Sequence, residues 1–231
     1  MSASAPAPAP GVAFKEDFCV ASIPEQGIIS QFLQRAVEVA VSVTALIVAS
    51  PIMLAVGVII WRGTPGPVLF RQQRLGKGTV PFSFLKFRTL YADARERWPE
   101  LYAYQYSNEE LKGLAFKIRN DPRVTPQGQW LRKSTMDELP NFWKVLTGEM
   151  ALVGPRPEIP EMLPYYHREA LLKFTVRPGV TGLAQISGRG RLSFHETVAL
   201  DVEYVRNRSL LLDVKIILLT VLKIITRDGA F

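Results

Sequence analysis

The hydrophobic pattern of the chain is dominated by one uncharged segment of 23 residues, from Val39 to Trp61. As a single helix rising 1.5 Å per residue it would be about 35 Å long, enough to cross the hydrocarbon core of a bilayer, about 30 Å thick. Ser50 and Pro51 lie at its centre. A proline removes one helix hydrogen bond, and a neighbouring serine hydroxyl can bond the carbonyl that is freed. The pattern therefore predicts a helix that is broken or kinked at Ser50-Pro51.

Two membrane arrangements fit this helix: a kinked helix that spans the bilayer, or one that bends and returns to the same face. The segment after it carries four basic residues between positions 62 and 77, which favours a cytoplasmic location, whereas the segment before it has mixed charge. Charge alone therefore does not decide between the two arrangements. A buried helix in the core of a soluble protein is a third interpretation, which a length of 23 residues disfavours.

A second apolar segment, residues 210–231, is interrupted by Asp213, Lys215 and Lys223 and has no uncharged stretch long enough to cross a membrane. Asp213, Thr220 and Arg227 recur every seven residues, which places them in a narrow polar strip along a helix. Such a helix either packs into a core or lies among lipid headgroups. We favour partial membrane contact for it.

Between these two segments, residues 62–209 alternate short apolar strings with glycine, proline and helical stretches, which predicts an α+β domain with more helix than strand. The string RLGKGT at 74–79 lacks the order of a phosphate-binding loop and is predicted to be a turn between strands. A chain of 231 residues with 48% hydrophobic side chains suffices for one substantial core. We therefore expect an Ala/Pro-rich tether (residues 1–30), a membrane helix (31–61) and one globular domain (62–231).

The segment LRKSTMDELPNFWKVLTGEM, residues 131–150, carries the strongest local signals. Ser134 and Asp137 have the spacing of a helix capping box, and apolar residues then recur at positions 139, 142, 143 and 146. A helix is therefore predicted to begin near Met136 and to end at Gly148. Pro140 fits there because the amides of a first helical turn have no partner within the helix.

Asp137 and Glu138 are consequently two adjacent carboxylates at a helix N-terminus, where the helix dipole stabilises negative charge. Acidic residues are common in first turns, so the pair alone does not establish a catalytic site. Basic residues on stiff backbone add to it: Lys86, Arg88, Arg132, Lys133, Arg156 and Arg177. Prolines on both sides of Arg156 restrict its loop and favour bidentate phosphate contacts, whereas a solvated turn is an equal alternative for Arg177.

This combination suits a carboxylate that attacks a diphosphate. At about 4 Å, two like unit charges repel by about 4 kcal/mol at an effective dielectric constant of 20, so the attack requires cations. Arginines and a Mg²⁺ ion would supply them, and an aspartyl phosphate is a known kind of covalent intermediate. The net charge of +7 agrees with anionic partners. The single cysteine, Cys19, excludes an intrachain disulfide and a cysteine-based zinc site.

From about Gln34 to Phe231 the chain resembles the bacterial sugar transferases, also called monotopic phosphoglycosyl transferases, and among them the short members. The resemblance rests on several motifs in the same order: the hydrophobic segment with Ser50-Pro51, KFRTL, NDPRVTPQGQWLRKSTMDELPNFWKVLTGEMALVGPRPE, VRPGVTGLAQISGRG and LDVEYVRNRSLLLDVK. Met136 and Asn141 depart from the family pattern, in which leucine usually precedes the acidic pair and glutamine follows the proline. Neither departure is expected to touch the chemistry, although a change at Asn141 can alter substrate contacts.

The resemblance implies a cytoplasmic catalytic domain, anchored in the bacterial inner membrane by a re-entrant helix broken at Ser50-Pro51 and by interfacial amphipathic helices. It implies that Asp137 is the nucleophile and a ligand of an essential Mg²⁺. Glu138 would complete the dyad and assist the acceptor in the second half-reaction. The other implied site residues, which would bind substrate or phosphate, are Lys86, Arg132, Arg156, Pro157 and Asp201.

The implied reaction transfers a sugar phosphate from a nucleotide sugar, expected to carry uridine, to polyprenyl (undecaprenyl) phosphate through a covalent aspartyl intermediate. Membrane lipids are the expected surroundings, and an oligomer is compatible with the sequence. The alternative is a non-catalytic basic membrane adaptor, which leaves the acidic pair and the GPRP motif without a purpose. Nucleic acid is not an expected partner, because the basic residues are dispersed and form no recognised module.

Overall fold

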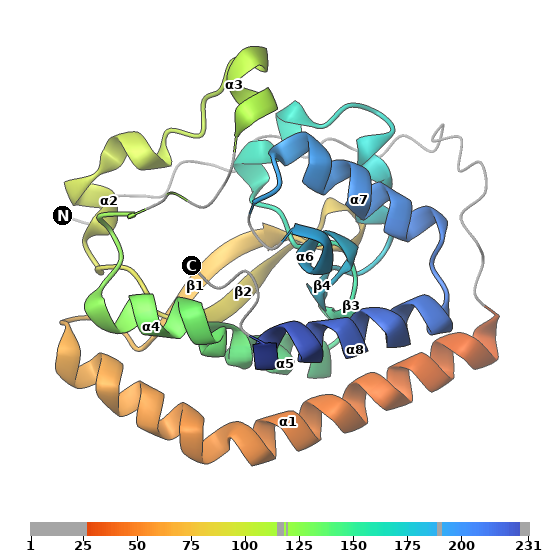
Figure 1. Cartoon of the computed structure of the whole chain (residues 1–231), viewed down its shortest axis with the longest axis horizontal. Helices are drawn as coiled ribbons and strands as arrows, with labels where there is room; N and C mark the ends of the chain where they lie inside the picture. The colour runs from red at the N-terminus through yellow and green to blue at the C-terminus, as the bar shows by residue number, and fades with distance from the viewer. Residues whose placement is uncertain (1–26, 115–117, 119, 189–190, 227–231) are drawn as a thin grey trace.

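A computed structural model of the chain defines residues 27–114, 118, 120–188 and 191–226 (Figure 1). Most of the predicted tether, residues 1–30, lies outside the described residues, and so does Arg227. The described part is mostly helical and contains two small sheets, which confirms the predicted α+β class with more helix than strand.

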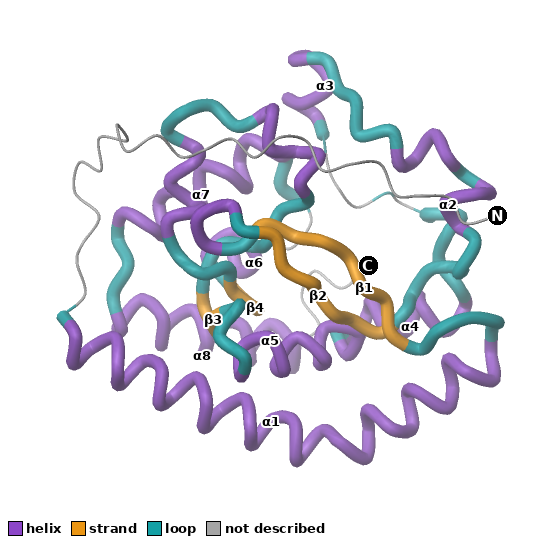
Figure 2. The backbone as a smooth tube through the Cα atoms, turned by 180° about the vertical axis from the view of Figure 1, so that it is seen from behind, coloured by secondary structure: helices purple, strands orange, loops and turns teal. Residues whose placement is uncertain are grey.

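The hydrophobic segment forms α1 (Ile28–Gly63), one continuous helix of 36 residues that contains Pro51. The Ser50 hydroxyl donates a 2.8 Å hydrogen bond to the carbonyl of Ile47. That carbonyl lies four residues before Pro51, so it is the one whose amide partner the proline removes. The predicted role of Ser50 is thereby confirmed. Figures 1 and 2 show α1 as a bowed helix with both ends curving toward the rest of the chain.

A β-hairpin follows α1. Strand β1 (Leu69–Leu75) pairs in antiparallel with β2 (Pro81–Phe87), so that Leu69 lies opposite Phe87. The connection is a single 3-10 turn, Lys77–Thr79, in which Gly78 takes a left-handed conformation with φ of 68°. The prediction that residues 74–79 form a turn between strands is confirmed.

The described residues also contain seven further α-helices, several short 3-10 helices and a second sheet. The helices are α2 (Ala94–Arg97), α3 (Asn108–Gly113), α4 (Pro126–Ser134), α5 (Phe142–Leu146), α6 (Leu183–Gly188), α7 (Phe194–Arg206) and α8 (Leu210–Thr226). In the second sheet, β3 (Ala151–Val153) pairs in parallel with β4 (Gly179–Thr181). Figure 2 shows this short sheet apart from the longer hairpin.

The local structure around the acidic pair differs from the prediction. α4 ends at Ser134, whose hydroxyl donates to the Leu131 carbonyl at 3.1 Å, so the predicted capping box does not form. Thr135 then takes a left-handed conformation with φ of 58°, and a 3-10 helix, Met136–Asn141, precedes α5. Pro140 lies inside this 3-10 helix, where its missing amide costs one backbone hydrogen bond. The predicted start near Met136 is confirmed, and Gly148, with φ of 88°, follows the end of α5.

Two arginines expected near phosphate instead hold α1 against the domain. Arg177 lies 2.8 Å from the Glu38 carboxylate of α1, and that carboxylate is only 2% exposed. Arg88 is also buried and donates to the carbonyls of Thr64 and Pro65, just after α1, at 2.8 Å each. Arg88 and Arg177, which the sequence groups with the basic residues around the acidic pair, are therefore contacts that support α1. Only long-range packing distinguishes a basic residue that caps carbonyls or pairs with a buried carboxylate from one that binds an anion.

Both arms of α1 contact the domain, but in different ways. The arm before Pro51 uses polar contacts such as Glu38, and Arg35 donates to the carbonyls of Val145 and Leu146 at the end of α5. The arm after Pro51 uses apolar contacts, in which Val56 and Ile60 pack with residues of β2 and α4. Even so, only 11% of the most apolar window of α1 is buried, and the helix is long and apolar enough to cross a membrane.

Helix α8 lies on the side of the domain that faces α1 (Figures 1 and 2). Its polar strip turns inward: the buried Asp213 accepts a 2.7 Å hydrogen bond from Tyr204, and the Thr220 and Thr181 hydroxyls lie 2.7 Å apart. Apolar side chains on its other side remain exposed, among them Leu211 at 81%. The packing alternative is thus confirmed for the polar strip, while the apolar face stays available for the predicted membrane contact.

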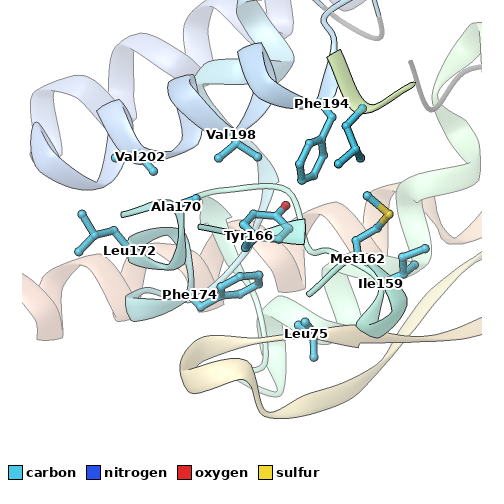
Figure 3. Close-up of a cluster of buried hydrophobic side chains, with 11 residues drawn as sticks. Leu75, Ile159, Met162, Tyr166, Ala170, Leu172, Phe174, Phe194, Val198 and Val202 are labelled. Carbon is cyan, nitrogen blue, oxygen red and sulfur yellow. The ribbon is translucent and has the colours of Figure 1, made fainter. Parts of the chain in front are cut away.

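The largest hydrophobic cluster lies between the hairpin and α7 (Figure 3). Tyr166 is its centre, with its ring 5.3 Å from that of Phe174 and 5.2 Å from that of Phe194. Aromatic pairs at such distances contribute about 0.5–1.5 kcal/mol each beyond the area that they bury. The cluster therefore gives a rigid support to the segment between β3 and α7, which carries Arg156.

Candidate active site

The acidic pair, Lys86 and Arg156 come from three separate elements that meet at one place. Asp137 and Glu138 stand in the first turn of the 3-10 helix Met136–Asn141, which packs against β2, the strand of Lys86. Arg156 follows β3, and its Nη2 atom lies 3.1 Å from Glu138 Oε1. The structure thus brings together four of the predicted site residues from distant parts of the chain.

Asn141 connects the acidic pair to the strand of Lys86. It is fully buried, and its side-chain oxygen accepts a 3.1 Å hydrogen bond from the backbone amide of Leu85. Its side-chain nitrogen donates a 3.1 Å hydrogen bond to Glu138 Oε2. Position 141, where the chain departs from the family pattern, is therefore in direct contact with the dyad.

The two carboxylates have opposite electrostatic settings. Burial, and next to it the charge of Glu138, raise the pKa of Asp137 to about 6, against an opposing effect of Lys86, Arg156 and Arg132. Burial also acts to raise the pKa of Glu138, but Arg156 and Lys86 outweigh it and hold that pKa below its usual range. Neighbouring carboxylates with separated pKa values are typical of catalytic pairs. Glu138 is therefore the more acidic carboxyl of the pair, and Asp137 is the one whose ionised form its surroundings disfavour.

Lys86 is held as a cation of reduced basicity beside the pair. Burial lowers its pKa to about 8, while the carboxylates of Glu138 and Asp137 oppose that decrease. At neutral pH the ammonium group therefore remains mostly charged. Its Nζ atom also lies 5.6 Å from the centre of the Phe70 ring on β1.

The Arg156 loop is fixed by backbone contacts as well as by its prolines. The Gly179 amide donates to the Pro155 carbonyl at 2.9 Å, and the Gly154 amide donates to Thr181 at 2.9 Å. A Cβ atom at Gly179 would lie 2.1 Å from the Gly154 nitrogen, so only glycine allows this approach. The Arg156 side chain itself is 44% exposed, which leaves its guanidinium accessible to a ligand.

Asp201 and Pro157 lie beneath this loop rather than at its surface. Asp201 is 1% exposed and forms a 3.0 Å ion pair with Lys173, which is 2% exposed. Burial raises the pKa of Asp201, against the opposing effects of Lys173 and of the backbone of Arg156. The buried Pro157 accepts a 3.1 Å hydrogen bond from Arg74 Nη1. Asp201, through the backbone of Arg156, and Pro157, next to Arg156 in the chain, therefore help to hold the Arg156 loop.

A second charged cluster surrounds Asp201, which we call the support cluster and define as Glu158, Tyr166, Lys173 and Asp201. Tyr166 donates to Glu158 Oε2 at 2.8 Å and receives a hydrogen bond from Lys173 at 3.0 Å. Lys173 Nζ also lies 3.9 Å from Glu158 Oε2. We call Lys86, Asp137, Glu138 and Arg156 the site cluster.

Arg132 stands at the edge of the site cluster. Its Nε atom donates to the Thr89 hydroxyl at 3.1 Å, and its Nη1 atom lies 3.7 Å from Asp121. It contributes to the field at Asp137 and lowers the pKa of that carboxyl. Lys133, next to it, is exposed.

Some contacts that shape the site were not predicted from the sequence. Arg74, counted only as a charge after the membrane helix, contacts Glu158 at 4.0 Å and the Pro157 carbonyl. Asn141 lies three positions after Glu138, a spacing that brings side chains together across one helical turn and could have indicated their contact. No local pattern indicates Lys173, because its partners Glu158 and Asp201 are remote in sequence.

The donor atoms limit which metal the site could hold. Among the described residues, no group of three or more histidine, cysteine, aspartate or glutamate side chains converges on one point. The dyad supplies two carboxylates, which is the number that Mg²⁺ commonly takes from protein when substrate phosphates and water complete its shell. The site therefore fits a hard cation that binds together with a phosphorylated ligand.

Comparison with known proteins agrees with the geometry. An undecaprenyl-phosphate galactose phosphotransferase of Salmonella typhimurium is 36% identical over 202 residues, covering 87% of this chain and 42% of that protein. An undecaprenyl-phosphate glucose phosphotransferase of Komagataeibacter xylinus is 38% identical over 209 residues, covering 86% of this chain and 37% of that protein. The exopolysaccharide production protein ExoY of Rhizobium meliloti is 35% identical over 198 residues, covering 86% of this chain and 88% of that protein.

The chain thus spans less than half the length of the first two relatives and most of the third. The family model for bacterial sugar transferases matches residues 29–227, which include α1, the site cluster and the support cluster. On this match and these relatives, the chain belongs to the bacterial sugar transferase family.

Proposed function

We propose that this chain transfers a sugar phosphate from a nucleotide sugar, with uridine as its base, to undecaprenyl phosphate at the cytoplasmic face of the bacterial inner membrane. The observation that carries the proposal is the dyad, in which a carboxyl with a pKa of about 6 lies among Lys86, Arg156 and an ionised neighbour. It packs near α1, a helix long and apolar enough to cross a membrane. Relatives named as undecaprenyl-phosphate sugar phosphotransferases support the same reaction class.

In the first half-reaction, an oxygen of Asp137 forms a bond to the β-phosphorus of the donor. The bond between that phosphorus and the bridging oxygen breaks, and the electron pair leaves with the nucleoside monophosphate. In the second, a phosphate oxygen of the lipid acceptor bonds to the same phosphorus, and the Asp137 carboxylate departs. The product is a polyprenyl diphospho-sugar, and the intermediate divides one difficult displacement into two easier steps.

The neighbours of Asp137 have separate roles in these steps. Lys86 and Arg156 offset the repulsion between carboxylate and diphosphate, which is about 4 kcal/mol for each pair of unit charges at 4 Å and an effective dielectric constant of 20. Glu138, held by Arg156 and Asn141, is placed to accept a proton from a protonated acceptor phosphate. Asp201 and Pro157 keep the Arg156 loop in position.

The dyad also fits a Mg²⁺ ion, which Asp137 would hold with phosphate oxygens of the donor. When bound, the ion neutralises phosphate charge and polarises the phosphorus-oxygen bonds. The raised pKa of Asp137 supports this assignment, because a buried carboxylate with surplus negative charge gains most from a divalent cation.

For the membrane topology, we propose that α1 is re-entrant and that both of its ends lie in the cytoplasm. Three observations support this: Pro51 within α1, where Ser50 bonds the carbonyl that the proline frees; the curvature of α1 in Figure 1; and the docking of both arms on one domain. A helix with one end on the far side of the bilayer could not place Glu38 against Arg177 and Val56 against the hairpin at once. The exposed apolar face of α8 would then lie at the same membrane surface.

A single-turnover experiment tests the catalytic proposal. Purified protein in detergent, given a panel of nucleotide sugars and Mg²⁺ without acceptor, should release about one nucleoside monophosphate per active site, and intact-protein mass spectrometry should show one added sugar phosphate. Asp137→Asn should remove both signals and lower turnover at least about a thousandfold. Asp93→Asn, which alters an exposed carboxylate on another surface, is the matched control and should behave as wild type. Turnover by Asp137→Asn close to wild type would disprove the assigned nucleophile.

A further inference from the structure

An apolar groove of about 800 Å³ lies between α1 and the domain. One wall is a single face of the second arm of α1 and the residues just before Pro51, where Leu46, Met53, Gly57 and Trp61 follow helical spacing. Apart from the indole N–H groups of Trp61 and Trp143, Ser50 is the one polar side chain in its lining, and its hydroxyl already donates to the Ile47 carbonyl. The groove therefore offers a ligand apolar surface and almost no polar contact.

The other wall belongs to the elements that carry the site cluster. Leu85 and Phe87 line the groove and flank Lys86 on β2, and Pro140 lines it two residues after Glu138. Because successive side chains of a strand point to opposite faces, Lys86 projects away from the groove while its two neighbours project into it. The groove thus lies on the α1 side of the hairpin, with the cations and carboxylates on the other side of the same strand.

We propose that this groove holds the first isoprene units of the polyprenyl phosphate acceptor and guides its phosphate past Pro140 to the site cluster. The inference rests on the proposed function and adds to it a binding site for the acceptor chain. It depends on the match between the ligand and the surface: an apolar chain beside apolar walls, and a phosphate beside Lys86 and Arg156.

The groove is expected to act by orientation rather than by strong attraction. A chain that leaves the bilayer for the groove gains little hydrophobic free energy, because lipid tails are as apolar as the groove walls. Its contribution is instead to hold the acceptor phosphate near the aspartyl intermediate, where proximity accelerates the second displacement. A change in groove volume should therefore affect the second half-reaction and leave the first unchanged.

Gly57→Leu tests this directly. A Cβ atom at Gly57 would lie 3.6 Å from Val68 Cγ1, an ordinary contact, so the larger side chain extends into the groove without a clash at its base. The matched control is Ala55→Leu, which adds a similar volume at an exposed position of the same helix outside the groove lining. Both variants are compared in nanodiscs, with thermal unfolding as a check on folding.

The expected result for Gly57→Leu is a fall of about tenfold in kcat/KM for undecaprenyl phosphate, the size of effect that a few carbon atoms produce in an apolar pocket. Transfer to geranyl phosphate, whose chain is too short to fill the groove, should fall much less. Release of nucleoside monophosphate without acceptor should stay at the wild-type level, and Ala55→Leu should match wild type throughout. If Gly57→Leu does not fold, Trp61→Ala, which widens the groove at a 68% exposed side chain, should alter the preference between long and short acceptors instead.

Three outcomes would overturn the groove proposal: wild-type kinetics with both acceptors, an equal loss for long and short acceptors, or the same loss in Ala55→Leu. Displacement of co-purified phospholipid by Gly57→Leu without any change in acceptor kinetics would show that the groove holds ordinary bilayer lipid, which also rejects it. The proposed function fails separately, if the wild-type protein releases no nucleoside monophosphate.

Discussion

The site cluster and the support cluster contain similar groups but are built in opposite ways. Each has two carboxylates and nearby cations: Arg156 pairs with Glu138 in the site cluster, and Arg74 lies 4.0 Å from Glu158 of the support cluster. In the support cluster, Lys173 is 2% exposed and lies within 4 Å of both carboxylates. In the site cluster, the Arg156 side chain is 44% exposed, and among the described residues no ion pair forms with Asp137.

The difference teaches how one small domain separates stability from chemistry. A buried cluster whose carboxylates lie within 4 Å of one buried ammonium group is closed to a ligand, whereas an open cluster with a carboxylate outside any ion pair and an accessible cation can bind a phosphate and a metal ion. The closed cluster lies under the Arg156 loop and keeps it in place. The open cluster uses that position for catalysis.

The largest expected effect on folding comes from opening the support cluster. Lys173→Met should destabilise the protein by about 3–5 kcal/mol, because it leaves the buried Asp201 without its cation and leaves Glu158 with Arg74 alone. The decrease should appear as a lower thermal unfolding midpoint in detergent. Arg97→Met is the control, since it removes one partner of an exposed 2.6 Å pair with Asp93 and should cost about 0–1 kcal/mol. Equal effects of the two substitutions would contradict the distinction between the clusters.

Removing a carboxylate from the site cluster is expected to have a smaller effect on stability, and one of opposite sign: the free energy of unfolding should rise. The folded-state pKa of Asp137, about 6, is above the ordinary value of 3.8. The contribution of this carboxyl to the free energy of unfolding is therefore highest below pH 3.8 and is lost as the pH rises through 6. With a chelator present, Asp137→Asn should therefore stabilise the protein by about 1–3 kcal/mol at pH 8 and change little at pH 4.

The comparison of unfolding midpoints at the two pH values measures this effect. Added Mg²⁺ should reduce the advantage of Asp137→Asn, because the ion stabilises only the protein that keeps the carboxylate. A variant that is less stable than wild type at pH 8 would show that Asp137 is a structural group like those of the support cluster.

The smallest expected effect is a change in the pH dependence of activity on substitution of Asn141, which links the dyad to β2. Asn141→Asp keeps an acceptor for the Leu85 amide but adds a negative charge beside Glu138. That charge favours protonation of the dyad, so the acidic limb of the activity profile should move to higher pH, by about one unit, with about a tenfold loss at a pH below the optimum. Asn141→Gln restores the amide and should return the profile toward wild type. An unchanged acidic limb in Asn141→Asp would show that Asn141 does not influence the protonation of the dyad.

Much of the architecture could be predicted from neighbouring residues alone. The uncharged segment with Ser50 and Pro51 predicts a bent apolar helix, and the hydroxyl bonds the carbonyl that the proline frees, as expected. The turn at 74–79, the helical start near Met136 and the role of Gly148 are also confirmed. The capping box at Ser134 fails because Thr135 takes a left-handed conformation and ends α4 first.

Neighbouring residues alone do not predict which basic residues lie at the dyad and which hold other parts of the fold in place. Arg156 and Arg177 both stand beside prolines, yet Arg156 meets Glu138 whereas Arg177 meets Glu38, 139 positions earlier in the chain. Asp201 was assigned to the site through its motif, but its partner is Lys173 beneath the Arg156 loop.

Short-range chain chemistry is therefore enough to specify the apolar helix with its bend, the hairpin turn and the acidic pair at the start of a helix. These features depend on backbone preferences and hydrogen bonds within a few residues of each other. Long-range packing alone selects which cations face that pair, how far each carboxylate is buried, and where the apolar groove runs. Those properties arise from groups far apart in the chain, and a pKa or a binding surface depends on everything that folding brings within a few ångströms of it.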